Sequence, residues 1–535
     1  MTEQPADTCS APQPTAKLQV HEDVESRIGV DVALNRVHSI QHAWAAVLGL
    51  LLVAYLAWLS PLIAPYAGGS DSSGYLWSAR LLRHAMLSAR VDVPSRFPLE
   101  VVGPGVFVPL GGKLRPGTLE LVPTYPTGLP LHIAAASLLV SEESAVKAVL
   151  LFAAGGTLCV LYLLGREAGL TRLWAGAACL LIACSPLFAF LAVQPLSDVL
   201  ATLWAETAVL GAWLTRRRRA FAVFAGASLG VATLVRPTNL LLLLPVAVAL
   251  PATPGNYARL LTGALPFAAF LMEFQALAYA HPLASGYGDV SSAFSWNNVG
   301  SSLRHYMIWL PQLASWLVVL VPAAWWGWRG DLMRWRLIAG AWLLAIFGAY
   351  AFYLLTSETW WYLRFVLPAF PPLIIAGLVG LKEITRAVAQ RVTRVGWPRV
   401  VDAAATVAIA TCVGALVRGP QFDSYRSVKS DEGVYREALK LMTLETPPHA
   451  PVLMVQMTGA ANYYAPTIRF LRFDRLTPNA WHAVRTWQAR EGVAIEAALF
   501  PFEQEQMFPG GRPLLPCAWQ PRGRYRYVTF WECPP

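Results

Sequence analysis

Two carboxylates and two guanidinium groups are the side chains of this chain best suited to chemistry. Asp71 lies in the turn-forming segment GSDSSGY, just after the first long apolar run, and Asp198 lies in a short polar turn between two later runs. Arg236 and Arg364 each border another apolar run. A carboxylate can take a proton from an acceptor hydroxyl or amine, and a guanidinium can bind a phosphate leaving group as its charge develops. These groups together suit the transfer of a group from a phosphate-linked lipid.

Each of these side chains also has a purely structural interpretation. Asp71 and Asp198 both precede helix-like sequence, and Asp is a favoured N-cap residue. Arg236 and Arg364 would serve equally well to anchor helix ends at lipid headgroups. The chemical role is the leading hypothesis, with Asp71 and Asp198 as catalytic residues and with Arg364, Arg236, Arg80 and Tyr75 as residues that bind the phosphate of the donor.

The sequence assigns no metal ligands. Zinc sites need histidines or cysteines at characteristic spacings, and the histidines at 84, 132, 281 and 305 do not have them. A divalent cation, Mg²⁺ or Mn²⁺, stays open as a cofactor, because one of the two carboxylates would be able to hold it.

The elements that position these residues are expected to be membrane-spanning helices. Of the 535 residues 56% are hydrophobic and 14% charged, which is far more apolar than an ordinary globular protein. Several runs reach the roughly 20 continuous apolar residues that a helix needs to cross a bilayer. The formal charge of +10 does not indicate nucleic acid, because clusters such as Arg216 to Arg219 lie between apolar runs, where positive cytoplasmic loops belong.

Hydropathy and the placement of Lys and Arg predict about eleven transmembrane helices. The basic links between them then all fall on the side of the N-terminus, which we expect to be cytoplasmic, in the cell (inner) membrane. The C-terminus is expected outside, in the periplasm or the extracellular space. The predicted spans are 42–60, 145–164, 173–191, 198–214, 220–236, 238–251, 260–280, 306–327, 336–355, 364–381 and 399–417.

Three regions result from this topology. Residues 1–41 are polar and expected to be disordered in the cytoplasm, and residues 42–419 form the transmembrane domain. Within that domain residues 61–144 form one long external loop, because the apolar stretch 126–140 is too short to span and is expected to lie along the outer surface.

Residues 420–535 are expected to form a small external α/β domain. Strands are predicted at 452–457, 468–473, 493–499 and 525–531, with helices at 459–464 and 480–490. Cys517 and Cys533 both fall in this polar region. A disulfide between them and two free thiols are equally expected, because the sequence does not give their separation.

Four segments carry a resemblance to a known family. The chain resembles the GT-C superfamily of polyprenyl-phosphate-sugar-dependent glycosyltransferases, in particular the group of protein O-mannosyltransferases and lipid A aminoarabinose transferase, and the resemblance covers residues 42 to about 417. The segments are SDSSGY at 70–75, YPTGLPL at 125–131, GASLGVATLVRPTN at 226–239 and YLRFVLPAFPP at 362–372.

The resemblance implies a membrane glycosyltransferase that inverts the sugar it transfers. It implies that Asp71 activates the acceptor, that Asp198 is the second acidic residue and that Arg364 contacts the phosphate. The partners would be a polyprenyl-phosphate sugar and a lipid, glycan or protein acceptor. This chain has Asp71-Ser72 where many relatives carry paired acidic residues, which puts metal dependence in doubt.

Two other functions stay as alternatives. An O-antigen polymerase or ligase would also transfer glycans, but its large external loop would come late in the chain. A lipid or solute transporter would place charged residues deep in several spans, whereas here the candidate charges are expected at one membrane face.

Overall fold

The computed structural model describes residue 44 and residues 46–391, 397–446 and 450–535. The predicted disordered segment 1–41 therefore lies outside the described residues. The chain divides into two compact units, Met1–Trp58 and Leu59–Pro535. An apolar helix, Ala46–Leu62, occupies the position of the first predicted span. The second unit contains all the residues predicted to form the site.

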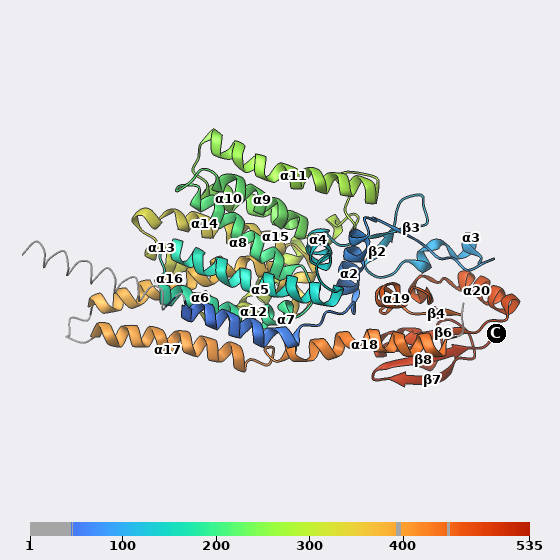
Figure 1. Ribbon diagram of the computed structural model, residues 1–535. Coiled ribbons are helices and arrows are strands. Elements are labelled where there is room, and N and C mark those ends of the chain that lie inside the picture. Colours follow the sequence, from blue (N-terminus) through green and yellow to red (C-terminus); the bar gives the residue numbers. More distant parts are fainter. Residues whose placement is uncertain (1–43, 45, 392–396, 447–449) are drawn as a thin grey trace, which may run out of the picture. The chain divides into compact units, whose positions relative to one another are not determined.

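Helices occupy the segments in which the other spans were predicted (Figure 1). In the described part of the chain five helical segments are long and apolar enough to cross a membrane, or up to seven if each of two bent pairs is one span. The count of eleven crossings therefore stays a prediction. The five are α5 (Glu142–Glu167), α11 (Pro254–Tyr279), a segment Gly330–Ala351 that contains α14 (Arg334–Leu343) and α15 (Ala349–Ala351), a segment Trp360–Arg391 that ends in α16 (Phe370–Arg391), and Val400–Arg418 within α17 (Trp397–Arg418).

Two predicted spans are bent rather than straight. Between α6 (Arg172–Ala183) and α7 (Pro186–Ala192) the axis turns by 65°, because Ser185 and Pro186 end one helix and begin the next. The predicted span 306–327 turns by 118° between α12 (Val299–Leu313) and α13 (Val321–Gly327). The break lies at Ser315, whose extended backbone separates the two helical segments and whose hydroxyl oxygen accepts from the N–H of Leu317 at the start of the second.

Three shorter apolar helices bring the predicted site residues to one end of the bundle. Helix α8 (Asp198–Leu214) begins at Asp198, and α9 (Phe221–Val235) packs against it in the return direction and ends beside Arg236. A short 3-10 segment then leads into α10 (Leu243–Ala249). At about 1.5 Å per residue, α8 separates its two ends by about 25 Å.

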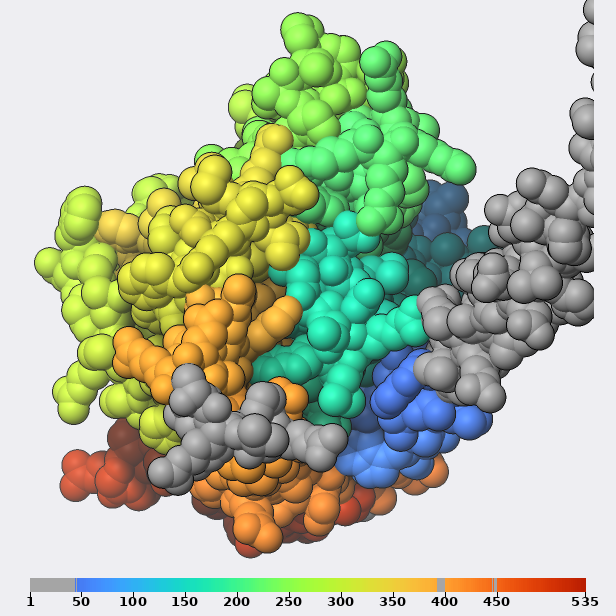
Figure 2. Space-filling view, turned by 90° about the vertical axis from the view of Figure 1, so that its left-hand side faces the viewer, coloured from blue at the N-terminus to red at the C-terminus, as the bar shows by residue number. Residues whose placement is uncertain are grey.

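The basic links gather at the other end of these helices, as predicted. Arg334 donates to the carbonyl oxygens of Val248 and Leu250, and Lys382 donates to that of Gly169. Figure 2 shows this face, where α5 and α6 in teal, α9 and α10 in green, α13 and α14 in yellow and α16 in orange lie together. The side of the membrane on which this end lies is not established by these contacts and stays a prediction.

The segment after the first apolar helix is ordered, as expected for the long loop. It contains α2 (Ser70–Arg83), the short helix α3 (Leu99–Val102) and α4 (Gly128–Ser137). Helix α4 lies within the segment 126–140 that was predicted to form a surface helix, but it is shorter. It also contains an unpredicted antiparallel sheet in the order β1-β3-β2. Its strands are β1 (Ala89–Arg90), β2 (Gly112–Leu114) and β3 (Glu120–Pro123).

The C-terminal region combines a five-stranded sheet with helices, in agreement with the predicted α/β character. The order is β5-β4-β6-β8-β7, in which β4 is parallel to β5 and β6, and β8 is antiparallel to β6 and β7. The strands are β4 (Pro451–Leu453), β5 (Arg469–Leu471), β6 (Ile495–Leu499), β7 (Gln520–Tyr525) and β8 (Val528–Cys533), and the helices are α18 (Ser424–Glu445), α19 (Thr458–Tyr464), α20 (Pro478–Glu491) and α21 (Pro501–Met507). Cys517 and Cys533 form a disulfide.

Candidate active site

Two ion pairs form the centre of the candidate site. Arg364 Nη2 donates to Asp71 Oδ2 over 2.6 Å, and Arg236 Nη2 lies 2.8 Å from Asp198 Oδ1. Arg236 Nη1 also donates to the backbone carbonyl oxygen of Arg364 over 3.3 Å, which joins the two pairs. The four charged residues predicted from the sequence therefore meet, although 293 residues separate Asp71 from Arg364.

The first turn of α2 presents Asp71. The N-cap of this helix is Gly69 and that of α8 is Ser197, so neither Asp71 nor Asp198 is the N-cap. Both carboxylates instead lie in first turns, where the positive end of the helix dipole favours negative charge. Tyr75, one turn after Asp71, donates its hydroxyl to Ser197 Oγ over 2.9 Å, which ties α2 to the start of α8.

Two glycines of the quoted segments allow close backbone approach. A Cβ on Gly74 would lie 2.5 Å from the ring of Tyr125, whose hydroxyl is 2.7 Å from Ser70 Oγ. A Cβ on Gly128 would overlap the backbone nitrogen of Val235, the residue before Arg236. Any larger residue at either position would force these elements apart.

The four sequence segments that carry the resemblance close into a ring around the site. Segment 70–75 contacts segment 125–131 through Ser70 and Tyr125. Segment 125–131 meets segment 226–239 at the close approach of Gly128 to Val235, and Arg236 of the latter segment donates to segment 362–372. Arg364 then closes the ring on Asp71. Residues far apart in the chain thus converge on a single site.

The two carboxylates differ in their exposure to solvent. The side chain of Asp71 is 27% exposed, whereas that of Asp198 is 1% exposed. Only Asp71 is therefore accessible to a substrate without rearrangement. Asp198 is better placed to hold Arg236, since removing one partner of a buried ion pair leaves the other charge uncompensated.

The electrostatics of Asp71 favour its ionised form. Burial acts to raise its pKa, but the positive charge of Arg364 and hydrogen bonds from Tyr125 and Arg364 outweigh burial and lower the pKa below that of an ordinary Asp. Burial, together with the neighbouring Asp71 carboxylate, raises the pKa of Tyr125, so this phenol stays protonated and able to donate.

Glu432 is a member of the site that the sequence did not indicate. From α18 its Oε2 accepts from the hydroxyl of Ser72 over 2.8 Å and from the backbone N–H of Gly69 over 3.3 Å. Burial is the main cause that raises the pKa of this carboxyl, although these hydrogen bonds oppose it. No local pattern marks Glu432, because it lies in an amphipathic helix 360 residues after Ser72.

One predicted donor-binding residue lies in a different contact. Arg80 donates to Glu142 over 2.7 Å and to the carbonyl oxygen of Tyr463 over 2.7 Å, and its guanidinium stacks on the Tyr463 ring. Nine residues after Asp71 on the same helix, Arg80 points to the opposite side of α2. In this arrangement it joins α2 to α5 and α19 rather than to the two ion pairs.

The residues present do not fit a metal ion well. Among the residues that the structure describes, no group of three or more His, Cys, Asp and Glu side chains comes together in a way that could hold a metal. Asp71 and Asp198 are each paired with an arginine instead. Neither carboxylate is therefore assigned as a ligand of a divalent cation.

Comparison with known structures identifies the fold. Over 92% of this chain and 98% of the other, the structure is similar to ArnT from Cupriavidus metallidurans bound to undecaprenyl phosphate, with a TM-score of 0.57 at 13% sequence identity. The chain has the GT-C fold. The sequence-based resemblance to GT-C glycosyltransferases is thus confirmed at the level of fold.

Two further GT-C structures are more distant. The archaeal oligosaccharyltransferase AglB from Archaeoglobus fulgidus, in complex with an inhibitory peptide and a dolichol-phosphate, gives a TM-score of 0.50 at 12% identity over 85% of this chain and 70% of AglB. The arabinofuranosyltransferase AftD from Mycobacteria gives 0.50 at 12% identity over 90% of this chain but only 41% of AftD. No protein-family model and no curated protein matches the sequence.

Proposed function

We propose that this protein is a membrane glycosyltransferase that moves a sugar from a polyprenyl-phosphate donor to a lipid, glycan or protein acceptor. The observation that carries the proposal is the partly exposed Asp71 paired with Arg364, with Arg236 bound to the backbone of Arg364, on a GT-C fold. One carboxylate able to accept a proton stands beside two guanidinium groups able to bind phosphate.

The proposed reaction is a single displacement at the anomeric carbon of the donor sugar. The acceptor oxygen or nitrogen forms a bond to this carbon while the bond from the carbon to the phosphate oxygen breaks. The electron pair of the broken bond leaves with the polyprenyl phosphate, and the acceptor proton passes to the Asp71 carboxylate. Attack from the side opposite the phosphate inverts the sugar.

The arginines would stabilise the charge that develops on the leaving phosphate. Arg364 Nε is buried and has no hydrogen-bond partner among the described residues, so it is an unused donor beside Asp71. Arg236 would be the second phosphate contact, and Asp198 would hold it as a positioning residue. Tyr75 would keep the start of α2 against α8 through Ser197.

The location of the reaction is part of the same proposal. The end of the bundle that carries Asp71 would face the periplasm or the cell exterior, and the basic end would face the cytoplasm. The enzyme would lie in the inner membrane, surrounded by lipid, and would take its donor from the outer leaflet.

Reconstitution with a panel of polyprenyl-phosphate sugars tests the proposal. The purified protein should release polyprenyl phosphate and transfer sugar with at least one donor, and Asp71→Asn should lower the rate by about 10²–10⁴-fold, the range that general acid–base catalysis contributes. Full transfer by Asp71→Asn would disprove the catalytic role of this residue. Transport of a donor without transfer would support the transporter alternative. The buried carboxylate of Glu206 in α8, which has no hydrogen-bond partner among the described residues, favours that alternative.

A further inference from the structure

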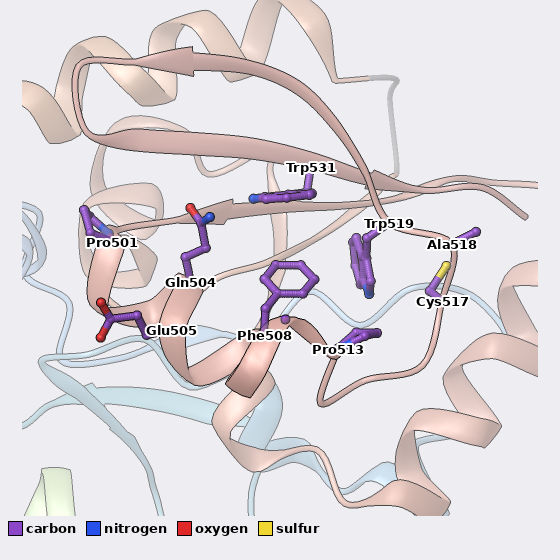
Figure 3. A pocket seen from close by; sticks show the side chains of 10 residues that line it. Pro501, Gln504, Glu505, Phe508, Pro513, Cys517, Ala518, Trp519 and Trp531 are labelled. Carbon is purple, nitrogen blue, oxygen red and sulfur yellow. The ribbon is translucent and has the colours of Figure 1, made fainter.

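A cleft in the C-terminal region lies apart from the two ion pairs. Its volume is about 700 Å³, within the roughly 300–1,000 Å³ usual for ligand pockets. Three rings form its walls and two polar side chains of α21 border one end (Figure 3). We call it the aromatic cleft and define it by Phe508, Trp519, Trp531, Gln504 and Glu505.

Packing behind the aromatic cleft and between its own rings holds these rings in place. Trp519 stacks against Trp481 with 6.3 Å between ring centroids, and its indole N–H donates to the carbonyl oxygen of Leu515 over 2.9 Å. Phe508 and Trp531 lie 4.7 Å apart, centroid to centroid, at an angle of 40°. A ligand would therefore find its stacking surfaces already ordered, which reduces the entropy cost of binding.

The disulfide links the two sides of the aromatic cleft. Cys517 stands two residues before Trp519 and lines the cleft, and Cys533 ends β8, which carries Trp531. The bond thereby fixes the loop that carries Trp519 to the strand that carries Trp531. This bond limits how far the loop and the strand can separate.

The chemistry of the walls selects the ligand. The negative faces of aromatic rings attract the slightly positive C–H groups on one face of a sugar ring, while sugar hydroxyls need hydrogen-bond partners. The amide of Gln504 and the carboxylate of Glu505 supply such partners at the end opposite Trp519 (Figure 3). A lipid chain would use the rings but none of these polar groups.

We propose that the aromatic cleft binds an oligosaccharide, the glycan part of the acceptor on which the enzyme acts. This inference rests on the proposed function, because sugar transfer is what makes a glycan the expected ligand. The inference adds to the proposed function by selecting an acceptor that carries a glycan. This acceptor would bind through its glycan in the C-terminal region while its reacting end lies at Asp71. The carboxylate of Glu505 favours neutral sugars over acidic ones.

Equilibrium binding to the full-length protein in lipid nanodiscs tests the inference. The probes are linear tetrasaccharides of glucose, mannose, galactose and arabinose, titrated by calorimetry and followed by saturation-transfer NMR. At least one should bind, and Trp519→Ala and Trp531→Ala should each weaken its binding about tenfold or more, as loss of a stacking anchor does. Trp519→Phe keeps an aromatic face and should retain part of the affinity.

Phe502→Ala is the matched control, because this ring is 50% exposed on the same helix α21 but does not line the cleft. It should bind the probe as the unmodified protein does. Decaproline, a peptide that also stacks on aromatic rings, is titrated as a competing type of ligand. The inference is overturned if no tetrasaccharide binds or if Trp519→Phe and both alanine variants bind the sugar unchanged. It is also overturned if decaproline binds and the sugars do not. Binding needs no turnover and should persist in Asp71→Asn, so its failure is distinct from a failure of transfer.

Discussion

Asp71 stays ionised because the attraction of Arg364, together with hydrogen bonds from Tyr125 and Arg364, outweighs the cost of burying its carboxylate. A depressed pKa makes the group a weak base in isolation, but it ensures that the proton-accepting form is fully populated near neutral pH. The same contact stabilises the fold above the unfolded-state pKa of about 3.9, and this stabilisation is lost as the pH falls through the lower pKa of the folded state.

Removing Arg364 should change the pH dependence of transfer, because Arg364 lowers the pKa of Asp71. In Arg364→Gln burial acts without the opposing charge, so the pKa of Asp71 should rise. The residual kcat should then fall on the acid side at a higher pH than in the unmodified protein. A pH profile of kcat for both proteins between about pH 3 and pH 9 measures the shift, in a range that brackets the ordinary Asp pKa of about 3.9. Identical acid limbs would show that Asp71 does not control the rate.

Glu432 should act as a positioning residue. Glu432→Ala leaves the Gly69 N–H without its partner and leaves the Ser72 hydroxyl only its contact with the Gly69 carbonyl oxygen. The lost bonds cost about 1–3 kcal/mol for a buried group and free the start of α2. We expect kcat to fall by roughly tenfold with little change in KM, and Glu432→Gln, which still accepts one hydrogen bond, to recover most of it.

A second measurement separates this role from a general loss of stability. The folded-state pKa of Glu432 is raised, so the stability it contributes is present below its unfolded pKa of about 4.3 and is lost as the pH rises through the folded pKa. The Tm of Glu432→Gln minus the Tm of the unmodified protein should therefore increase as the pH rises. Glu437→Ala, on the more exposed side of α18, is the control and should change neither kcat nor this slope.

The site residues differ in how far the sequence predicts them. Asp71, Asp198, Arg236 and Arg364 were found because charges at the borders of apolar runs stand out, and the structure brings all four together. Their catalytic and binding roles stay predictions. The sequence could not indicate Glu432, because its partners are a backbone N–H and a serine far away in the chain, and contacts of this kind leave no spacing to detect.

At the scale of elements, the apolar runs predicted where helices lie but not how they bend. The segment at 362–372 begins not as a regular α-helix but in a ten-residue 3-10 helix, Trp360–Ala369, before α16. Such long 3-10 segments are uncommon. Pro368 lies inside this one, and Pro371 and Pro372 lie in the first turn of α16, where their missing N–H groups cost least. Arg364 is thus presented by a tighter helix than the predicted span implied.

The close approach at Gly74 predicts a severe effect of one methyl group. Gly74→Ala would push the Tyr125 ring away, and with it the contact of Ser70 that leads the chain toward Asp71. We expect transfer to fall at least tenfold and the Tm to drop, since overpacking costs about 1–3 kcal/mol. Gly300→Ala on α12 meets no atom within 4 Å, so both quantities should stay as they are. Equal effects of the two substitutions would contradict the packing argument.

At the scale of the whole molecule, the two ends of the bundle have opposite expected locations. Insertion of green fluorescent protein after Arg218, at the basic end, should fluoresce, because that end is predicted to be cytoplasmic. Insertion of alkaline phosphatase after Asp289, in the link between α11 and α12, should be active, because that enzyme requires an oxidising exterior. As a control, the two reporters are exchanged. Green fluorescent protein after Asp289 should not fluoresce, and alkaline phosphatase after Arg218 should be inactive.

The contact between Glu432 and the start of α2 also has a consequence for biosynthesis. Ser72 and Glu432 are 360 residues apart, which ribosomes adding roughly 5–20 residues per second cover in about 20 to 70 s. Throughout that interval the nascent chain carries Asp71 without the anchor that holds its helix. A chain that ended before Glu432 would therefore present Asp71 on a helix whose start has lost its contacts to Gly69 and Ser72.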